Sequence, residues 1–263
     1  LLKNWQSNPP KIYCHDAGTA VRFLIPMIAA LGGFGVEVSA SKQMTRRPIQ
    51  ALIEALEQQG SKFRYTYTPG ALPLIIDKNK DNLGLSGGKL LVDTKDSSQF
   101  ISGLLMVAPF AQKPMDISLT QTRRQSYIDM TIKMMQDFGA DVKSLDKDSY
   151  FISNNKKYTP IEYNIEPDAS TASYFFAIAA LSGGEIRVPN LDYKKSLQGD
   201  VGFLGVLEQM GCEISYIKGQ DIGYTQVKGP KFLKGFGLDN PIDVSAFSDT
   251  FMTLAAIAPF ADK

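Results

Sequence analysis

The stretch Asp16-Ala-Gly-Thr-Ala-Val-Arg-Phe-Leu, residues 16–24, runs from an acidic residue through small residues into large apolar ones. An acidic or hydroxyl side chain before an apolar run predicts a helix start, because its oxygen accepts N–H groups that lack a partner in the first turn. Stretches of the same design begin at Ser97, Asp168 and Ser248. Their apolar runs lack a polar stripe, so we expect these helices to be buried on most sides. The chain therefore contains an internal repeat.

A second, amphipathic helix follows each of the first three helix starts. These helices are predicted over residues 47–60, 127–139 and 199–211, and each ends at a glycine, which readily takes the left-handed conformation after a helix. Strand-like stretches lie between and after the helices, at residues 36–39, 62–67, 72–76, 115–119, 141–145, 150–152, 185–188 and 213–217. Strands that alternate with helices in this way predict an α/β fold built from repeated units.

The composition bounds the class of protein. The chain has 263 residues, of which 44% are hydrophobic and 21% charged, and its net charge is +1. A net charge this close to zero produces no strong electrostatic attraction to nucleic acid or to a membrane surface. The apolar runs are too short to span a bilayer. Two cysteines, Cys14 and Cys212, and the histidine His15 form no metal-ligand spacing. We therefore expect no metal, no cofactor, and neither nucleic acid nor a membrane as partner.

Three of the predicted helix starts carry residues suited to binding an anion. Helix N-termini present N–H groups and a partial positive charge, which favour phosphates and carboxylates. Gly18 permits close approach of a ligand, and Ser97–Gln99 adds side-chain donors. The pair Arg46–Arg47 stands before Pro48, which favours the first position of a helix.

Each of these motifs also has a plainer interpretation. The serines and Asp249 are suited to capping their helices, and the arginines are suited to a solvated surface. The recurrence of ligand-capable residues at successive helix starts favours the functional interpretation. The residues alone thus predict a repeat α/β protein that binds a phosphorylated anion.

The chain resembles the EPSP synthase family at seven motifs that follow in the family's order. They are Asp16-Ala-Gly-Thr-Ala-Val-Arg, Met44-Thr-Arg-Arg-Pro-Ile, Ser97-Ser-Gln-Phe-Ile-Ser-Gly-Leu-Leu, Tyr127-Ile-Asp-Met-Thr, Asp168-Ala-Ser-Thr-Ala-Ser-Tyr-Phe, Gln198-Gly-Asp and Asp249-x-x-Met-Thr. Each motif alone is weak, whereas seven in order at matching spacing are highly specific. The resemblance covers essentially the whole chain.

The resemblance implies two similar domains, each built from three βαβαββ units, with the active site in the cleft between them. On this pattern residues 1–164 are the second and third units of the N-terminal domain, which binds shikimate 3-phosphate. Residues 165–263 are the first unit and the start of the second unit of the C-terminal domain. Both domains are then incomplete in this chain, and we interpret both of its ends as cut.

The resemblance also implies a reaction: the enolpyruvyl (carboxyvinyl) group passes from phosphoenolpyruvate to the 5-hydroxyl of shikimate 3-phosphate. The products are EPSP and phosphate, and the step belongs to the shikimate pathway of aromatic amino-acid biosynthesis. This transferase chemistry needs anion clamps, an acid for the methylene carbon and a base for the hydroxyl, without a metal. A cytoplasmic monomer is expected, and a plastid location stays open because the family's N-terminal segment is missing.

Carried over residue by residue, the resemblance assigns a set of binding and catalytic roles. Shikimate 3-phosphate is expected at Ser97, Ser98, Gln99, Arg124, Tyr127 and Asp249, and phosphoenolpyruvate at Gly18, Arg47 and Gln99. Asp249 is expected to bind the 5-hydroxyl and to act as the catalytic base.

The chain also departs from the family's pattern. Asp16 stands where the family has Asn, Gln43 replaces an Arg, and Arg124 stands about where the family has a phosphate-binding Ser. The family's Lys-Ser-x-x-Asn-Arg and Lys-Glu-x-Asp-Arg segments are absent from these 263 residues. We therefore expect the chain alone to be catalytically inactive.

Two alternatives stay open at this point. One is the sister enolpyruvyl transferase that acts on UDP-N-acetylglucosamine, which typically carries a Cys on a mobile loop. Neither Cys14 nor Cys212 has such a context. The other is a noncatalytic binding module that reuses the repeat, for example on RNA, although the chain has no basic stripe with interleaved aromatic residues.

Overall fold

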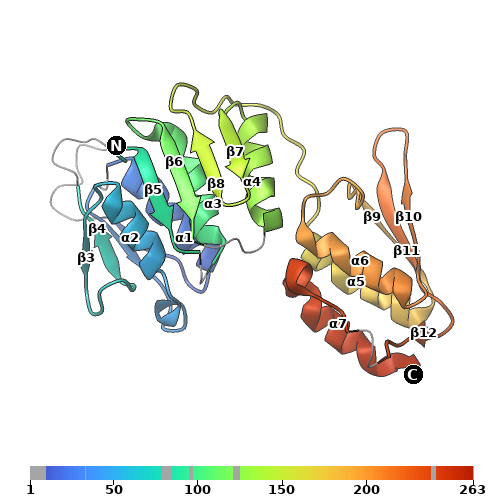
Figure 1. The fold of residues 1–263 in the computed structure, drawn as a ribbon. Helices are drawn as coiled ribbons and strands as arrows, with labels where there is room; N and C mark the ends of the chain where they lie inside the picture. The colour runs from blue at the N-terminus through green and yellow to red at the C-terminus, as the bar shows by residue number, and fades with distance from the viewer. Residues whose placement is uncertain are drawn as a thin grey trace. The chain divides into compact units, whose positions relative to one another are not determined.

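The computed structural model describes residues 10–32, 34–78, 84–94, 97–120, 125–237 and 241–262. The chain folds as two compact units, Leu1–Ile161 and Glu162–Lys263, each with its own hydrophobic core (Figure 1). The predicted α/β class is confirmed, since helices and strands alternate along most of the chain.

The first unit contains two copies of one βαβαββ motif. The first copy comprises β1 (Lys11–Tyr13), α1 (Gly18–Ala30), β2 (Val36–Ser39), α2 (Gln50–Gln58), β3 (Phe63–Tyr65) and β4 (Leu74–Ile76). The second comprises β5 (Gly88–Val92), α3 (Gln99–Val107), β6 (Met115–Leu119), α4 (Gln125–Asp137), β7 (Val142–Asp146) and β8 (Ser149–Ile152). Each copy forms a four-stranded sheet with the first two strands parallel, in the orders β1-β2-β4-β3 and β5-β6-β8-β7.

The two motifs of the first unit are joined through helices α1 and α3, which pack against each other. Gly103 permits this close approach, because a Cβ atom there would lie 2.7 Å from the carbonyl oxygen of Arg22 and 3.1 Å from Cγ of Pro26. Helix α4 is tied to α3 by the hydroxyl of Thr131, which lies 2.9 Å from Oγ of Ser102. These contacts hold α1, α3 and α4 against one another.

The second unit repeats the same order of elements from the first helix onward. It comprises α5 (Ala169–Ser182), β9 (Glu185–Pro189), the 3₁₀ turn η4 (Gly199–Val201), α6 (Gly202–Gln209), β10 (Glu213–Ile217), β11 (Tyr224–Lys228), β12 (Leu233–Lys234), the 3₁₀ turn η5 (Ser245–Thr250), α7 (Phe251–Ile257), the 3₁₀ turn η6 (Ala258–Phe260) and β13 (Ala261–Asp262). Its sheet has the order β10-β11-β9, and β12 pairs in parallel with β13.

The glycines that end the second helix of each repeat are confirmed as left-handed positions. Gly60, Gly139 and Gly211 have φ angles of 91°, 90° and 98°. The predicted strands at 36–39 and 115–119 are confirmed at those bounds as β2 and β6. Short-range turn chemistry thus places these boundaries well.

Some predicted helix starts differ in the structure. Asp168 is the N-cap residue of α5 and caps it with its side chain, which accepts from the backbone N–H of Ser170 at 3.0 Å. Asp16 instead accepts a hydrogen bond from the hydroxyl of Ser41. The run from Ser248 lies in the 3₁₀ turn η5, and α7 begins only at Phe251.

The expectation that the repeated helices are buried on most sides holds for α3 and is wrong for α5. Seven of the nine α3 residues are buried, because α1 and α4 pack against this helix. On α5 one face packs on β9, β11 and α7, and the other exposes large apolar side chains of Tyr174, Phe175, Ile178 and Leu181.

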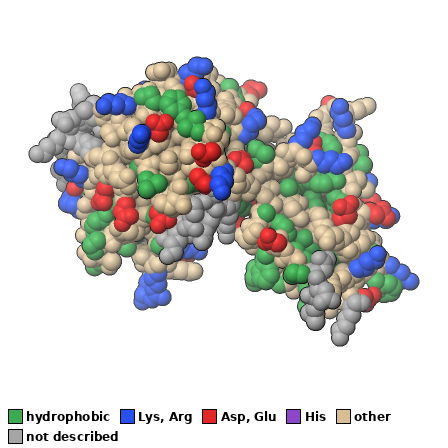
Figure 2. Space-filling view, viewed as in Figure 1, with side chains coloured by type: hydrophobic (Ala, Val, Ile, Leu, Met, Phe, Trp, Pro, Cys, Tyr) green, Lys and Arg blue, Asp and Glu red, His purple; other side chains and the backbone are tan. Residues whose placement is uncertain are grey.

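The surface and the helix lengths agree with the composition. On the face drawn in Figure 2, Lys and Arg side chains are interspersed with Asp and Glu side chains. Among the helices of the described residues, none is both long and apolar enough to cross a membrane.

Candidate functional site

The candidate site is built around the N-terminal end of α1. Strand β1 leads through a turn at His15, whose φ is 50°, directly into this helix. The backbone N–H of Cys14 donates to the carbonyl of Ser39 at 2.8 Å, which fixes the turn to the end of β2. The N-cap residue Ala17 has no side-chain cap bond, so α1 begins without a polar side chain over its first N–H groups.

Arg22 lies one helical turn beyond Gly18, on the same face of α1, and contacts the start of α3. Its Nη1 donates to Oε1 of Gln99 at 2.6 Å, and Nε2 of Gln99 donates to the hydroxyl of Thr19 at 3.3 Å. The Gln99 side chain therefore bridges the first turns of two helices that are far apart in the sequence. The Arg22 guanidinium also lies over the ring of Phe100, 5.6 Å from its centroid.

Arg47 approaches the same point from the connection between β2 and α2. It was expected just before a helix beginning at Pro48, but α2 begins at Gln50 and Arg47 is extended, with ψ at 135°. The physical reason is that a proline disfavours the helical conformation of the residue before it. The extended backbone projects the Arg47 side chain back toward α1.

Two guanidinium groups thus lie beside the buried Gly18. A Cβ atom on Gly18 would be 3.1 Å from Nη1 of Arg47 and 3.3 Å from Nη1 of Arg22. Burial lowers the pKa of Arg22 from its usual value, and the charge of Arg47 lowers it further. Nε of Arg22 is buried and has no hydrogen-bond partner within the described part of the chain.

This arrangement favours a bound anion. In the described ranges neither guanidinium forms an ion pair with a carboxylate. Two like charges at close range repel each other, and an anion between them relieves that repulsion. A planar guanidinium also matches the oxygens of a carboxylate or phosphate in a forked pair of hydrogen bonds.

The start of α3 adds polar groups to the site. Ser98 is its buried N-cap residue and makes no side-chain cap bond, whereas Oγ of Ser97 accepts the N–H of Gln99 at 3.2 Å. Ser97 and Gln99 remain partly exposed.

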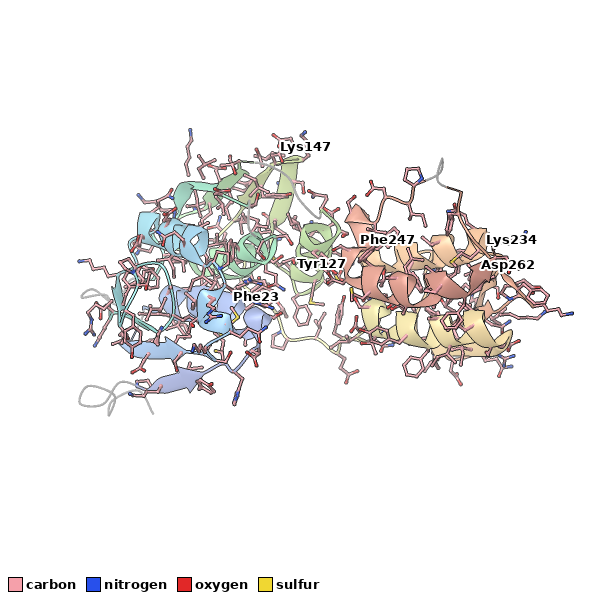
Figure 3. The ribbon with its side chains drawn as sticks, turned by 90° about the horizontal axis from the view of Figure 1, so that it is seen from below. Phe23, Tyr127, Lys147, Lys234, Phe247 and Asp262 are labelled. Carbon is pink, nitrogen blue, oxygen red and sulfur yellow. The ribbon has the colours of Figure 1, made fainter. Side chains whose placement is uncertain are left out.

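The other predicted residues of the first unit are placed as follows. Tyr127 is half-buried on α4 (Figure 3), where its carbonyl oxygen accepts the hydroxyl of Thr131 at 2.8 Å. Arg124, predicted to bind phosphate, lies outside the described residues. The structure thus brings together Gly18, Arg47 and Gln99, with Ser97 and Ser98 adjacent in sequence to Gln99.

Sequence reasoning missed Arg22 as a member of this cluster. The signal was present, because Arg22 ends the first quoted motif and lies four residues after Gly18. Residues four apart share one face of a helix. What the sequence did not provide is the packing of α1 on α3, which makes Gln99 its partner.

Asp249 belongs to the second unit. It is exposed in η5, where its Oδ1 accepts the hydroxyl of Ser248 at 3.3 Å. It does not cap the following helix, since the N-cap residue of α7 is Thr250 and makes no side-chain cap bond.

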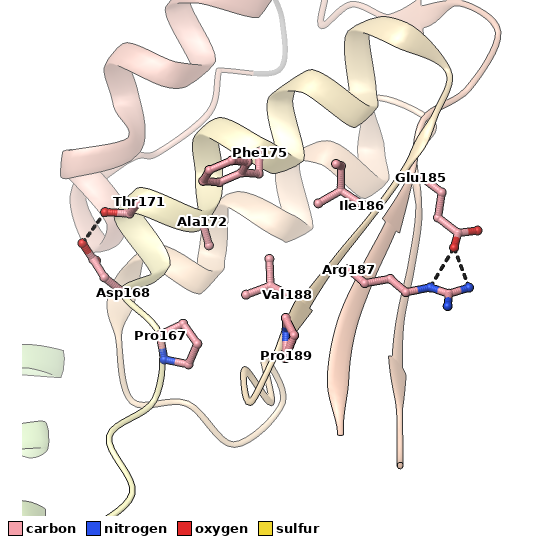
Figure 4. A pocket seen from close by; sticks show the side chains of 10 residues that line it. All are labelled: Pro167, Asp168, Thr171, Ala172, Phe175, Glu185, Ile186, Arg187, Val188 and Pro189. Atoms are coloured by element: carbon pink, nitrogen blue, oxygen red, sulfur yellow. Dashed lines mark hydrogen bonds and ion pairs between the residues drawn. The ribbon is translucent and has the colours of Figure 1, made fainter. Parts of the chain in front are cut away.

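The second unit also has a cavity of about 630 Å³ between α5 and β9 (Figure 4). Its lining residues are Pro167, Asp168, Thr171, Ala172, Phe175, Glu185, Ile186, Arg187, Val188 and Pro189. The charged groups in this lining already have partners: Asp168 accepts from Thr171 at 2.6 Å, and Arg187 pairs with Glu185 at 2.7 Å. None of the predicted site residues lies in this lining. Among the described residues, no group of three or more His, Cys, Asp or Glu side chains is arranged to hold a metal ion.

Comparison with known proteins gives consistent matches. The family model described as EPSP synthase (3-phosphoshikimate 1-carboxyvinyltransferase) matches residues 3–263. The 3-phosphoshikimate 1-carboxyvinyltransferase of Trichormus variabilis is 40% identical over 248 residues, covering 94% of this chain and 55% of that protein. The 3-phosphoshikimate 1-carboxyvinyltransferase 2 of Halalkalibacterium halodurans is 37% identical over 259 residues, covering 98% of this chain and 55% of that protein.

The fold comparison agrees with the sequence comparison. An EPSP synthase structure from Acinetobacter baumannii has a TM-score of 0.73 at 22% identity and covers 96% of this chain and 55% of that chain. At this identity the likeness concerns the fold alone. The chain spans about half the length of the curated relatives named above.

Proposed function

The chain belongs to the EPSP synthase family, and on that premise we propose that it forms part of an enzyme that transfers the enolpyruvyl group of phosphoenolpyruvate to the 5-hydroxyl of shikimate 3-phosphate. The curated relatives carry the name of this activity. Because the chain spans about half of their length, the activity is proposed for the whole protein, and this chain is proposed to supply part of its substrate-binding residues. The family match favours this function over transfer to UDP-N-acetylglucosamine.

The observation that carries the proposal is the pair of guanidinium groups beside Gly18. Phosphoenolpyruvate has a carboxylate and a phosphate on one small carbon frame, so it presents two anionic groups at short separation. Arg47 binds one of them, and Gly18 allows the ligand to approach the backbone at the start of α1. Gln99, held in place by Arg22, donates to the same ligand.

Shikimate 3-phosphate is proposed to bind beside it at the start of α3. Ser97 and Ser98 offer hydroxyl and backbone donors to its phosphate, and Gln99 contacts both substrates. Tyr127 and Arg124 are proposed to complete this half of the site.

Asp249 is proposed to accept the proton of the 5-hydroxyl. The hydroxyl oxygen then bonds to C2 of phosphoenolpyruvate while the methylene carbon takes a proton from an acid. In the resulting tetrahedral intermediate, the bond from C2 to the phosphate oxygen breaks and inorganic phosphate leaves. The proton that the acid gave is regained when the methylene group re-forms. The guanidinium groups stabilise negative charge throughout these steps.

A calorimetric titration of the chain with shikimate 3-phosphate tests the binding half of this proposal. The expected result is saturable binding that a Ser97→Ala/Ser98→Ala variant weakens, with no binding of UDP-N-acetylglucosamine. Saturable binding of UDP-N-acetylglucosamine instead, or salt-sensitive binding of RNA, would overturn it.

A turnover assay of the chain alone is expected to give no product above a protein-free control. The resemblance also supports a cytoplasmic monomer, and sedimentation of the purified protein tests its oligomeric state.

A further inference from the structure

Two family motifs of the second unit have no role in the proposed function: Asp168-Ala-Ser-Thr-Ala-Ser-Tyr-Phe and Gln198-Gly-Asp. The structure joins them through the side chain of Gln198. Its Oε1 accepts the backbone N–H of Ala169 at 2.8 Å, and its Nε2 donates to the carbonyl of Pro167 at 2.8 Å. The residue before η4 is therefore fixed to the chain that enters α5.

A buried carboxylate strengthens this link. Asp200 in η4 is only 4% exposed, and its Oδ2 accepts the hydroxyl of Ser170 at 2.7 Å. A carboxylate that is removed from water costs free energy unless its hydrogen bonds are replaced, so such a group holds its partners in a defined geometry. Turn η4 is thus held to α5 at two points, by Gln198 and by Asp200.

The same turn supports the segment that carries Asp249. Turn η4 packs against η5, and the contact continues at Gly202, the first residue of α6. A Cβ atom on Gly202 would lie 2.7 Å from Cδ1 of Phe247, a distance that requires the ring to move. Figure 3 labels Phe247 within this second unit.

Phe247 is directly connected to the geometry of Asp249, two residues later. Its backbone, with φ −134° and ψ 44°, interrupts the helical path of η5. Its carbonyl oxygen accepts the hydroxyl of the fully buried Thr250 at 2.8 Å, which closes a short loop around Asp249. A displaced Phe247 would therefore displace Asp249.

We propose that Gly202 and Asp200 are positioning residues for Asp249, and that they act through Phe247 and through η4. This inference rests on the proposed function, because that function gives Asp249 its role at the 5-hydroxyl. Gly202 leaves space for the Phe247 ring. Asp200 holds η4, against which η5 packs, to α5. The position of the Asp249 carboxylate affects the rate, since a misplacement of about 1 Å at a reacting group lowers rates by on the order of a hundredfold.

The test compares Gly202→Ala with Gly205→Ala on the same helix. Gly205 has no atom within 4 Å of the position that its Cβ would take, so this matched control adds the same methyl group to the same helix without touching Phe247. Two readouts are recorded: the carboxyl ¹³C resonance of Asp249 in the labelled chain, and kcat and KM in the full-length protein that contains this chain. Asp200→Asn provides a second, nearly isosteric perturbation, in turn η4.

The expected result is a shifted Asp249 resonance in Gly202→Ala and Asp200→Asn, and an unshifted one in Gly205→Ala. In the full-length protein, kcat falls by about tenfold to a hundredfold in Gly202→Ala, with KM for phosphoenolpyruvate little changed. Adding Phe247→Leu to Gly202→Ala makes room for the new methyl group and recovers part of kcat.

Three outcomes overturn the inference: an Asp249 resonance that stays in place in Gly202→Ala, a kcat that falls equally in Gly205→Ala, or a loss of thermal stability alone. Absence of turnover in the unsubstituted full-length protein is a different result. It refutes the proposed function, whereas the resonance measurement still decides whether Gly202 positions Asp249.

Discussion

Replacement of Arg22 by Met separates a binding role of this residue from a structural one. Methionine keeps a long apolar stem that fits between α1 and α3 and removes the guanidinium. In the free protein, the charged form of Arg22 is disfavoured by burial and by the neighbouring Arg47, both of which lower its pKa. The protein therefore holds Arg22 in an environment that does not favour its charge.

The expected change in stability is small because opposing contributions nearly cancel. The variant loses the 2.6 Å hydrogen bond to Gln99, a contact to a charged group that contributes about 1.5–3 kcal/mol. It also loses the cation–π contact with Phe100, about 0.5–1 kcal/mol. Against this, it removes the repulsion by Arg47 and the desolvation of a charged group. We expect the free energy of unfolding to change by no more than about 1 kcal/mol.

The expected change in ligand affinity is large. Loss of Arg22 removes positive charge beside the anion and frees the Gln99 amide from its fixed orientation. One charge-assisted interaction of about 1.5–3 kcal/mol corresponds to a loss of roughly 10-fold to 150-fold in affinity. Arg22→Lys keeps the charge and loses the forked geometry, so its affinity should lie between the two.

Two measurements decide the question. Urea unfolding gives the stability, and calorimetric titration with phosphoenolpyruvate, in the presence of saturating shikimate 3-phosphate, gives the affinity. A loss of more than about 2 kcal/mol in stability together with an unchanged affinity would refute the reasoning, since Arg22 would then be structural. A rise in salt concentration should weaken binding less in Arg22→Met than in the original protein, because fewer charges remain to be screened.

Three further predictions follow from other contacts. Gly18→Ala should leave the urea midpoint unchanged and lower the affinity for phosphoenolpyruvate by about tenfold in the same titration. The methyl group of the new alanine would displace the guanidinium groups of Arg47 and Arg22, whose Nη1 atoms lie 3.1 Å and 3.3 Å from its position. Asp168→Ala should lower the free energy of unfolding by about 0.5–2 kcal/mol in urea, because the cap of α5 is lost; an unchanged midpoint would contradict this. Burial raises the pKa of Cys212 from 9.0 to about 11, so its contribution to stability is present below pH 9 and is lost as the pH rises toward 11. The urea midpoint should therefore fall over that range, and Cys212→Ala should make the fall shallower.

The fold was largely predictable from local signals. The terminal glycines Gly60, Gly139 and Gly211 mark their boundaries because only glycine takes a positive φ without steric cost. Strands β2 and β6 follow from short β-branched and apolar runs between helices. These features depend on residues close in sequence, so a single sequence is enough to reveal them.

Other features of the site depend on contacts between distant segments. Gln99 and Arg22 are 77 residues apart, and no periodicity in either helix predicts that they meet. The extended conformation of Arg47 was foreseeable from the proline that follows it, but the direction of its side chain depends on how η2 (Met44–Arg46) packs. The exposed apolar face of α5 could not be distinguished from a buried one, because its sequence pattern is the same in both environments.

Three of the four repeated helix starts, those of α1, α3 and α5, differ in what satisfies their first N–H groups. At α5 the carboxylate of Asp168 and the amide of Gln198 accept the N–H groups of Ser170 and Ala169, so the protein's own oxygens fill the place of an anion. At α1 the N-cap residue makes no side-chain cap bond, and two arginine side chains stand beside Gly18. At α3 the N-cap residue makes none either, although Oγ of Ser97 accepts the N–H of Gln99. A helix start that is already capped gains little from a ligand, whereas an uncapped one beside two arginines gains both hydrogen bonds and charge. Residue differences at the cap, on a backbone that is otherwise repeated, therefore change which helix starts leave N–H groups available, and we propose that those of α1 and α3 are the ones that bind substrate.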